Sequence, residues 1–136
     1  MRAVLVDTGP LVALLDQSDS FHEEVTETVR GIQDRLVTVW PVVVEAMYLL
    51  SASWRAQKAL WEMVETGAVQ LVRLDESDVP ELKNLMEKYR DLPMDMADAA
   101  LVRVADREGI RRVLTLDKRH FSVYRLSRKG SFTLLP

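Results

Sequence analysis

The chain has 136 residues, 48% hydrophobic and 29% charged, which is typical of a globular protein and predicts a single domain over residues 1–136. It has no cysteine, which excludes disulfides, thiolate nucleophiles and Cys-ligated zinc and fits a cytoplasmic location. The net charge is −3, yet residues 1–100 hold nine Lys/Arg against eighteen Asp/Glu and residues 101–136 hold nine against three, so the C-terminal third is locally basic.

Short apolar runs alternate with helix-like segments along the chain. The first run, "AVLVD" at residues 3–7, is too short for a helix, and the helical spacing starts directly after it, with Thr8 or Gly9 opening the helix. No run is long enough to cross a bilayer, and we expect no signal peptide because a strand begins near the N-terminus. The pattern predicts strands at 3–7, 36–40, 69–74, 113–117 and 132–136, and helices at 8–17, 22–34, 41–53, 54–67, 76–91 and 95–109.

Strands that alternate with helices predict an α/β protein of three layers, α/β/α, with a central parallel sheet of about five strands. In such sheets, ligands bind outside the carboxyl ends of the strands, at the point where the strand order reverses. Asp7 closes the first predicted strand and Asp117 closes the fourth. We therefore expect these two carboxylates to meet at one edge of the sheet.

Two predicted helices add further acids. Glu45 is the only charged residue in "PVVVEAMYLLSAS", and an ionised carboxylate in so apolar a helix needs a cation or a donor. Asp98 has apolar residues at i+3, i+4 and i+7, so it points inward near the start of its helix, and Asp95 lies one turn earlier. Four or five converging negative charges require cations, and oxygen ligands without Cys or His suit Mg²⁺ or Mn²⁺.

Each acid also has a structural interpretation. Asp7 and Asp95 fit N-terminal helix caps, Asp117 fits a turn, and Glu45 fits the partner of a buried arginine. Taken singly, these interpretations are at least as good as a role in metal binding. The joint placement of the acids at one edge of the sheet favours the metal site, because caps and turns have no reason to gather there.

Four segments resemble the PIN domain family, and within it the toxins of the VapC type: "VLVDTGPLVALLD", "PVVVEAMYLL", "LPMDMADAALVRVA" and "VLTLDKRHF". They occur in the family's order and span nearly the whole chain. The resemblance implies a PIN-like fold and a metal-dependent endoribonuclease, with RNA as substrate, a cognate antitoxin as partner and a homodimer. It implies Asp7, Glu45, Asp98 and Asp117 as catalytic and metal-holding acids, Asp95 as an auxiliary ligand, and Thr8 and Thr115 as nearby hydroxyls.

The basic residues of the C-terminal third are candidates for contacts to an RNA backbone. His120 is a further candidate for a phosphate contact, although a surface role is favoured for it and for His22. The face that carries Trp54 and Trp61 is either core, the default, or a homodimer surface. The candidate backbone contacts are Arg103, Arg107, Arg111, Arg112, Lys118 and Arg119.

Other functional classes fit the sequence less well. A phosphotransferase of the haloacid dehalogenase type needs an acid two residues after the first strand's Asp, where this chain has Gly9. A receiver-type phosphoacceptor needs a Lys at a late strand end, where Asp117 precedes Lys118. A non-catalytic RNA- or protein-binding relative would gain nothing from an acidic pocket. A PIN nuclease that processes RNA without being a toxin stays open.

Overall fold

The computed structural model describes residues 2–127 and 130–136. Within these residues, five strands form one sheet in the order β3-β2-β1-β4-β5, and every neighbouring pair is parallel. The predicted central parallel sheet is therefore confirmed. The strands are β1 (Ala3–Val6), β2 (Arg35–Thr38), β3 (Gln70–Leu71), β4 (Arg112–Leu114) and β5 (Thr133–Leu135).

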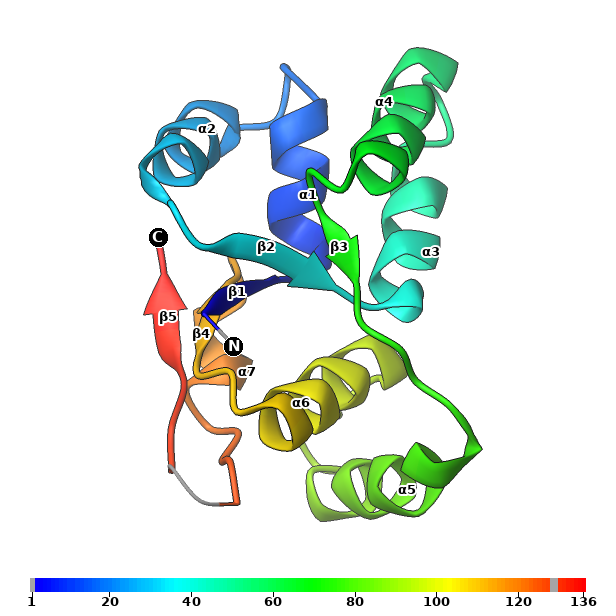
Figure 1. Ribbon diagram of the computed structural model, residues 1–136, viewed down its shortest axis with the longest axis vertical. Coiled ribbons are helices and arrows are strands. Elements are labelled where there is room, and N and C mark those ends of the chain that lie inside the picture. Colours follow the sequence, from blue (N-terminus) through cyan, green and yellow to red (C-terminus); the bar gives the residue numbers. More distant parts are fainter. Residues whose placement is uncertain (1, 128–129) are drawn as a thin grey trace.

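Helices cover both faces of the sheet, with α1 to α4 on one side and α5 and α6 on the other, so the predicted three-layer arrangement is confirmed (Figure 1). In the part of the chain that the structure describes, none of the helices is long and apolar enough to cross a membrane. The helices are α1 (Thr8–Leu15), α2 (His22–Gly31), α3 (Trp40–Leu49), α4 (Trp54–Thr66), the 3₁₀ turn η1 (Glu76–Asp78), α5 (Val79–Lys88), α6 (Met96–Glu108) and α7 (Lys118–Phe121).

Several boundaries differ from those that the sequence predicts. The strand β3 has two residues instead of six, because it lies at the sheet edge and pairs only with the last two residues of β2. The polar segment 76–91 is divided into η1 and α5, since the side chain of Asp75 caps the 3₁₀ turn. A helical turn, α7, starts immediately after Asp117 and was not predicted.

The core lies on both faces of the sheet. All four residues of β1 are buried, as expected for a parallel strand covered by helices on each side, and seven of the thirteen residues of α6 are buried. The side chains of Trp54 and Trp61, by contrast, are 65% and 46% exposed. Their predicted place in the core is therefore wrong, because helical periodicity marks an apolar face without saying what covers it.

The strand order reverses beside β1, and this reversal positions the site. The chain moves from β1 to β2 and β3 in one direction, then returns to place β4 and β5 on the other side of β1. Val6 is in register with Leu114, and the backbone N–H of Asp7 donates to the carbonyl of Leu114 at 2.9 Å. The segments that follow β1 and β4 therefore leave the sheet side by side, which is where α/β proteins bind ligands.

Candidate active site

A pocket of about 480 Å³ opens at the carboxyl ends of β1 and β4. All five acids that the sequence singled out line it, so the predicted convergence is confirmed. We call this cavity the acid pocket and these five residues its members. They come from the ends of two strands and from two helices on opposite faces of the sheet: Asp7, Glu45, Asp95, Asp98 and Asp117.

Asp7 is the most buried member of the acid pocket, with 7% of its surface exposed. It caps α1, and its Oδ1 accepts the backbone N–H of Thr8 at 2.8 Å while its Oδ2 accepts the hydroxyl of Thr115, also at 2.8 Å. Burial raises the pKa of Asp7 to about 6; these two hydrogen bonds oppose the rise, and the nearby charges of Asp117 and Glu45 add to it.

Two hydroxyls lie next to the acids, as the resemblance implied. The Thr115 hydroxyl donates to Asp7 and accepts the backbone N–H of Asp117 at 3.0 Å, so it ties the two strand ends together. Thr8 lines the pocket, and in residues 2–127 and 130–136 its hydroxyl is the one buried side-chain polar atom without a hydrogen-bond partner. A buried polar atom without a partner calls for water or an ion.

Asp98 and Asp95 are placed by the N-terminus of α6. Asp95 is exposed and caps the helix, and its Oδ1 accepts the backbone N–H of Asp98 at 2.8 Å. The carboxylate of Asp98 is half-buried and accepts the hydroxyl of Tyr124 at 2.7 Å. Burial raises the pKa of Asp98 well above its ordinary value, the Tyr124 bond opposes this rise, and the charges of Asp7, Asp95 and Asp117 add to it.

Asp117 caps the short helix α7 and contacts His120, which also lines the pocket. The Oδ2 of Asp117 lies 2.6 Å from Nδ1 of His120, whose Nε2 lies 3.1 Å from the carbonyl of Leu92. The hydrogen bond to Asp117 raises the pKa of His120. Ligand atoms of Asp98, Asp117 and His120 all lie within 4.8 Å of one another. The surface role favoured for His120 is therefore wrong, and its spacing three residues after a capping acid is the signal that could have found it.

Glu45 lies on α3, which packs against α6 across the edge of the sheet. It is half-buried and lines the acid pocket. Among the described residues, no lysine, arginine or histidine lies within ion-pair distance of Glu45, so its alternative interpretation as the partner of a buried arginine is wrong. Glu45 therefore adds charge to the pocket without bringing a cation.

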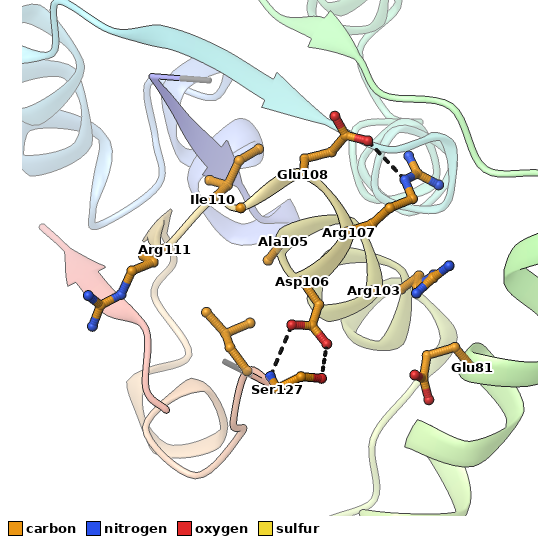
Figure 2. A pocket seen from close by; sticks show the side chains of 11 residues that line it. Glu81, Arg103, Ala105, Asp106, Arg107, Glu108, Ile110, Arg111 and Ser127 are labelled. Atoms are coloured by element: carbon orange, nitrogen blue, oxygen red, sulfur yellow. Dashed lines mark hydrogen bonds and ion pairs between the residues drawn. The ribbon is translucent and has the colours of Figure 1, made fainter. Parts of the chain in front are cut away.

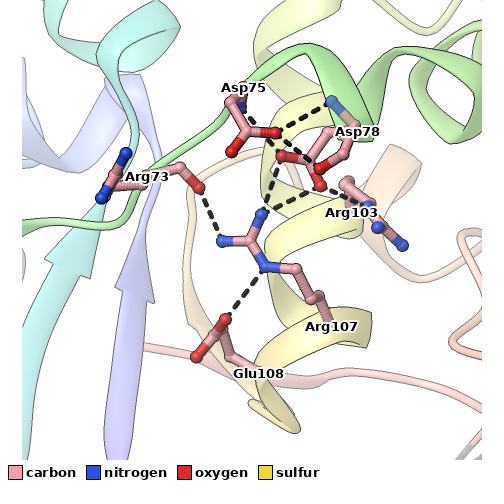
Figure 3. A network of polar contacts seen from close by, with 7 residues as sticks. Arg73, Asp75, Asp78, Arg103, Arg107 and Glu108 are labelled. Atoms are coloured by element: carbon pink, nitrogen blue, oxygen red, sulfur yellow. Dashed lines mark hydrogen bonds and ion pairs between the residues drawn. The ribbon is translucent and has the colours of Figure 1, made fainter.

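The arginines of α6 form a separate network with Asp78, a buried acid that the sequence reasoning missed (Figure 3). Nε of Arg103 and Nη1 of Arg107 donate to Oδ1 of Asp78 at 2.8 and 2.9 Å, and Nη1 of Arg107 also reaches Oδ2 at 2.8 Å. Arg107 donates as well to the carbonyl of Arg73. These bonds give both arginines a structural role, and neither of them lines the acid pocket, so contacts of Arg103 or Arg107 with RNA in that pocket lack structural support.

The remaining predicted contacts divide between the amino end and the carboxyl end of β4. Arg111 and Arg112 lie at the amino end of β4, away from the acid pocket, and Arg112 forms an ion pair of 2.7 Å with Asp34. Arg111 lines a second cavity, of about 580 Å³ and mixed charge, at the C-terminal end of α6 (Figure 2). Lys118 and Arg119 are exposed beside the pocket at the start of α7. A contact of Arg111 or Arg112 with RNA in the acid pocket therefore lacks structural support.

The acid pocket fits a hard divalent cation. Its donors are mainly carboxylate oxygens with hydroxyls beside them, which are the ligands that Mg²⁺ and Mn²⁺ prefer. One imidazole, that of His120, lies among them, which differs from the expectation of oxygen ligands without histidine. The orphaned hydroxyl of Thr8 is the kind of group that a bound ion or its water would satisfy. The raised pKa values of Asp7 and Asp98 fit the same site, because burial makes each negative charge costly, the neighbouring carboxylates add to that cost, and a bound cation would favour both ionised forms.

A family model described as the PIN domain matches residues 4–126. The chain belongs to the PIN domain family. This PIN domain is 34% identical to Ribonuclease VapC26 of Mycobacterium tuberculosis over 135 residues, which cover 98% of the chain and 100% of that protein. The predicted membership in the VapC type is therefore confirmed.

Solved structures with this fold include toxins of the same type. VapC20 of Mycobacterium tuberculosis, described as a toxin that cleaves the sarcin-ricin loop, matches with a TM-score of 0.74 and 18% identity over 81% of this PIN domain and 86% of that chain. A toxin-antitoxin complex from Klebsiella pneumoniae matches with a TM-score of 0.69 and 14% identity over 96% of each chain. At these identities, the likeness supports the fold.

Proposed function

We propose that this PIN domain is a metal-dependent endoribonuclease that hydrolyses RNA phosphodiester bonds as the toxin of a type II toxin-antitoxin pair. The observation that carries the proposal is the acid pocket, in which five carboxylates and an orphaned hydroxyl meet without a neutralising lysine or arginine among the described residues. The name of its relative, Ribonuclease VapC26, supports the substrate class, and the toxin-antitoxin complexes among the structural neighbours support the partner. With cellular RNA as substrate, we expect it to act in the cytoplasm.

The proposal gives the residues of the pocket distinct tasks. Bound Mg²⁺ or Mn²⁺ would make water a better nucleophile near neutral pH and would neutralise charge on the phosphate. Asp7, Glu45, Asp98 and Asp117 would hold the cation, and Asp95, exposed at the rim, would assist them. The Thr115 hydroxyl keeps Asp7 and the segment of Asp117 at a fixed distance.

The test is cleavage of single-stranded RNA by the purified protein after removal of metals. We expect no cleavage in EDTA and recovery on addition of Mg²⁺ or Mn²⁺, whereas Ca²⁺ and Zn²⁺ serve as comparison cations. Full activity in EDTA would contradict the metal site. RNA that stays intact with every cation would contradict the nuclease itself.

A second copy of the chain is the proposed partner for the apolar surface of α3 and α4. Trp40, Val44, Tyr48, Trp54 and Trp61 are each 46% or more exposed there, and Trp40 and Trp61 contact each other edge to face. Apolar side chains grouped in this way on a monomer usually mark an interface. We expect sedimentation to give a dimer and Val44→Lys to give a monomer. A monomeric wild-type protein at high concentration would contradict the homodimer.

A further inference from the structure

Tyr124 contacts the acid pocket and has no part in the roles proposed above. Its side chain is fully buried, and its ring packs edge to face against Tyr89 and Phe121, with centroids 5.0 and 5.1 Å away. The ring of His120 lies nearly parallel to that of Tyr124, with the two centroids 6.5 Å apart. A ring held by three neighbours leaves its hydroxyl one position, and this position is 2.7 Å from Oδ2 of Asp98.

The hydroxyl of Tyr124 has a directional effect on Asp98. The bond to Tyr124 engages Oδ2, and within residues 2–127 and 130–136 no hydrogen-bond donor reaches Oδ1. The two oxygens of one carboxylate are thereby made different. Packing alone gives no reason for the hydroxyl, because phenylalanine would fill the same space, and burying a hydroxyl is costly unless it bonds. Its one partner is a carboxylate of the acid pocket.

We propose that Tyr124 is a positioning residue, which orients the carboxylate of Asp98 so that Oδ1 faces a divalent cation. The inference rests on the metal site proposed above. Outer partners that orient a metal ligand typically account for 10–100-fold in metal affinity. A hydroxyl donated to a carboxylate is among the stronger hydrogen bonds in proteins, so it can hold one orientation against the repulsion of the neighbouring acids.

The test compares two variants that each remove a single oxygen from the same aromatic cluster. Tyr124→Phe removes the bond to Asp98. Tyr89→Phe removes a hydroxyl that accepts the backbone N–H of Arg125 at 3.0 Å, away from the acids. Mn²⁺ is titrated into the metal-free proteins, and free Mn²⁺ is counted by electron paramagnetic resonance. We expect the Mn²⁺ dissociation constant to rise about 10–100-fold in Tyr124→Phe and to stay at the wild-type value in Tyr89→Phe.

The Mn²⁺ concentration needed for half-maximal RNA cleavage is the second readout, and it should rise in parallel for Tyr124→Phe alone, with cleavage restored by excess Mn²⁺. Circular dichroism confirms that the metal-free variants are folded. Equal Mn²⁺ affinity in wild-type protein and Tyr124→Phe would overturn the positioning role and leave the metal site intact. Equal losses in both variants would assign the effect to the aromatic cluster and also overturn it. A wild-type protein that binds no Mn²⁺ would overturn the proposed function, and this inference with it.

Discussion

The helix α6 contributes residues to two sites that contain buried acids, and the two sites differ in how the negative charge is compensated. At its N-terminus, Asp98 meets the other members of the acid pocket, and its pKa is raised by burial. Further along, Arg103 and Arg107 reach across to Asp78. Burial alone would raise the pKa of Asp78, but the backbone N–H of Asp75 and the two guanidinium groups donate to its carboxylate and lower this pKa to about 2.

The difference separates structural acids from acids that await a ligand. Asp78 is 1% exposed and has two cations of its own, so it needs nothing from solution. The acid pocket has five carboxylates, and in residues 2–127 and 130–136 their one ion-pair partner is His120, at Asp117. Three of these acids cap helices, but neutral caps such as Ser or Asn would serve the helices as well without the repulsion among the charges. Their presence is best explained by a cation that arrives with function.

The largest expected effect in this comparison is the loss of stability when Asp78 is replaced. Asp78→Ala takes a shared carboxylate from two partly buried arginines, of which, among the described residues, Arg107 alone keeps another, that of Glu108, so we expect the free energy of unfolding to fall by about 3–5 kcal/mol. Urea unfolding measures this. Glu27→Ala is the control, because Glu27 pairs with Arg30 on the surface and its loss should cost no more than about 1 kcal/mol. A drop no larger for Asp78 than for Glu27 would show that the network contributes little.

A smaller effect is expected on the free energy of unfolding at acidic pH. The pKa of Asp78 is about 2 in the folded protein and 3.8 ordinarily, so its stabilising contribution is present above pH 3.8 and is lost as the pH falls toward 2. Urea unfolding at pH 5 and pH 3 should therefore show a loss in wild-type protein that exceeds the loss in Asp78→Ala, by on the order of 1 kcal/mol. Parallel losses in the two proteins would contradict a depressed pKa for Asp78.

The smallest expected effect concerns RNA binding at the two ends of β4. Arg119 follows Asp117 at the pocket, whereas Arg111 lies at the amino end of β4. We expect Arg119→Ala to reduce the slope of log affinity against log salt by about 0.7, the value for one phosphate contact with a single strand, and Arg111→Ala to leave it unchanged. Filter binding at several salt concentrations measures both slopes. The reverse result would place the RNA on the far side of the molecule.

The sequence predicted the acid pocket well, because its members follow from local patterns combined with one general rule. Asp7 and Asp117 follow short apolar runs, and parallel strands bring such positions to one edge. Asp98 follows from the apolar spacing of a single helix. The interpretation as helix caps was also correct for Asp7 and Asp95, whereas Asp117, expected in a turn, caps the short helix α7.

The features that the sequence did not predict depend on contacts between distant segments. Asp78 lies in a polar segment that was predicted as one helix, and its arginines come 25 and 29 residues later in the chain. Tyr124 reaches Asp98 across 26 residues. No local pattern encodes such pairs, because many acids and bases in a chain have these separations. The exposure of Trp54 and Trp61 was not predicted for a related reason, since the sequence of one chain does not show which partner would cover them.

The melting temperature of metal-free Asp98→Asn tests the central claim most directly. Asparagine has nearly the shape of aspartate, and its carbonyl can still accept the Tyr124 hydroxyl, so the change removes charge and little else. If the acid pocket awaits a cation, removing one of its charges relieves repulsion, and the variant should melt at the wild-type temperature or above it while Mn²⁺ stabilises it less. A lower melting temperature together with an undiminished Mn²⁺ shift would show that Asp98 is a structural acid like Asp78.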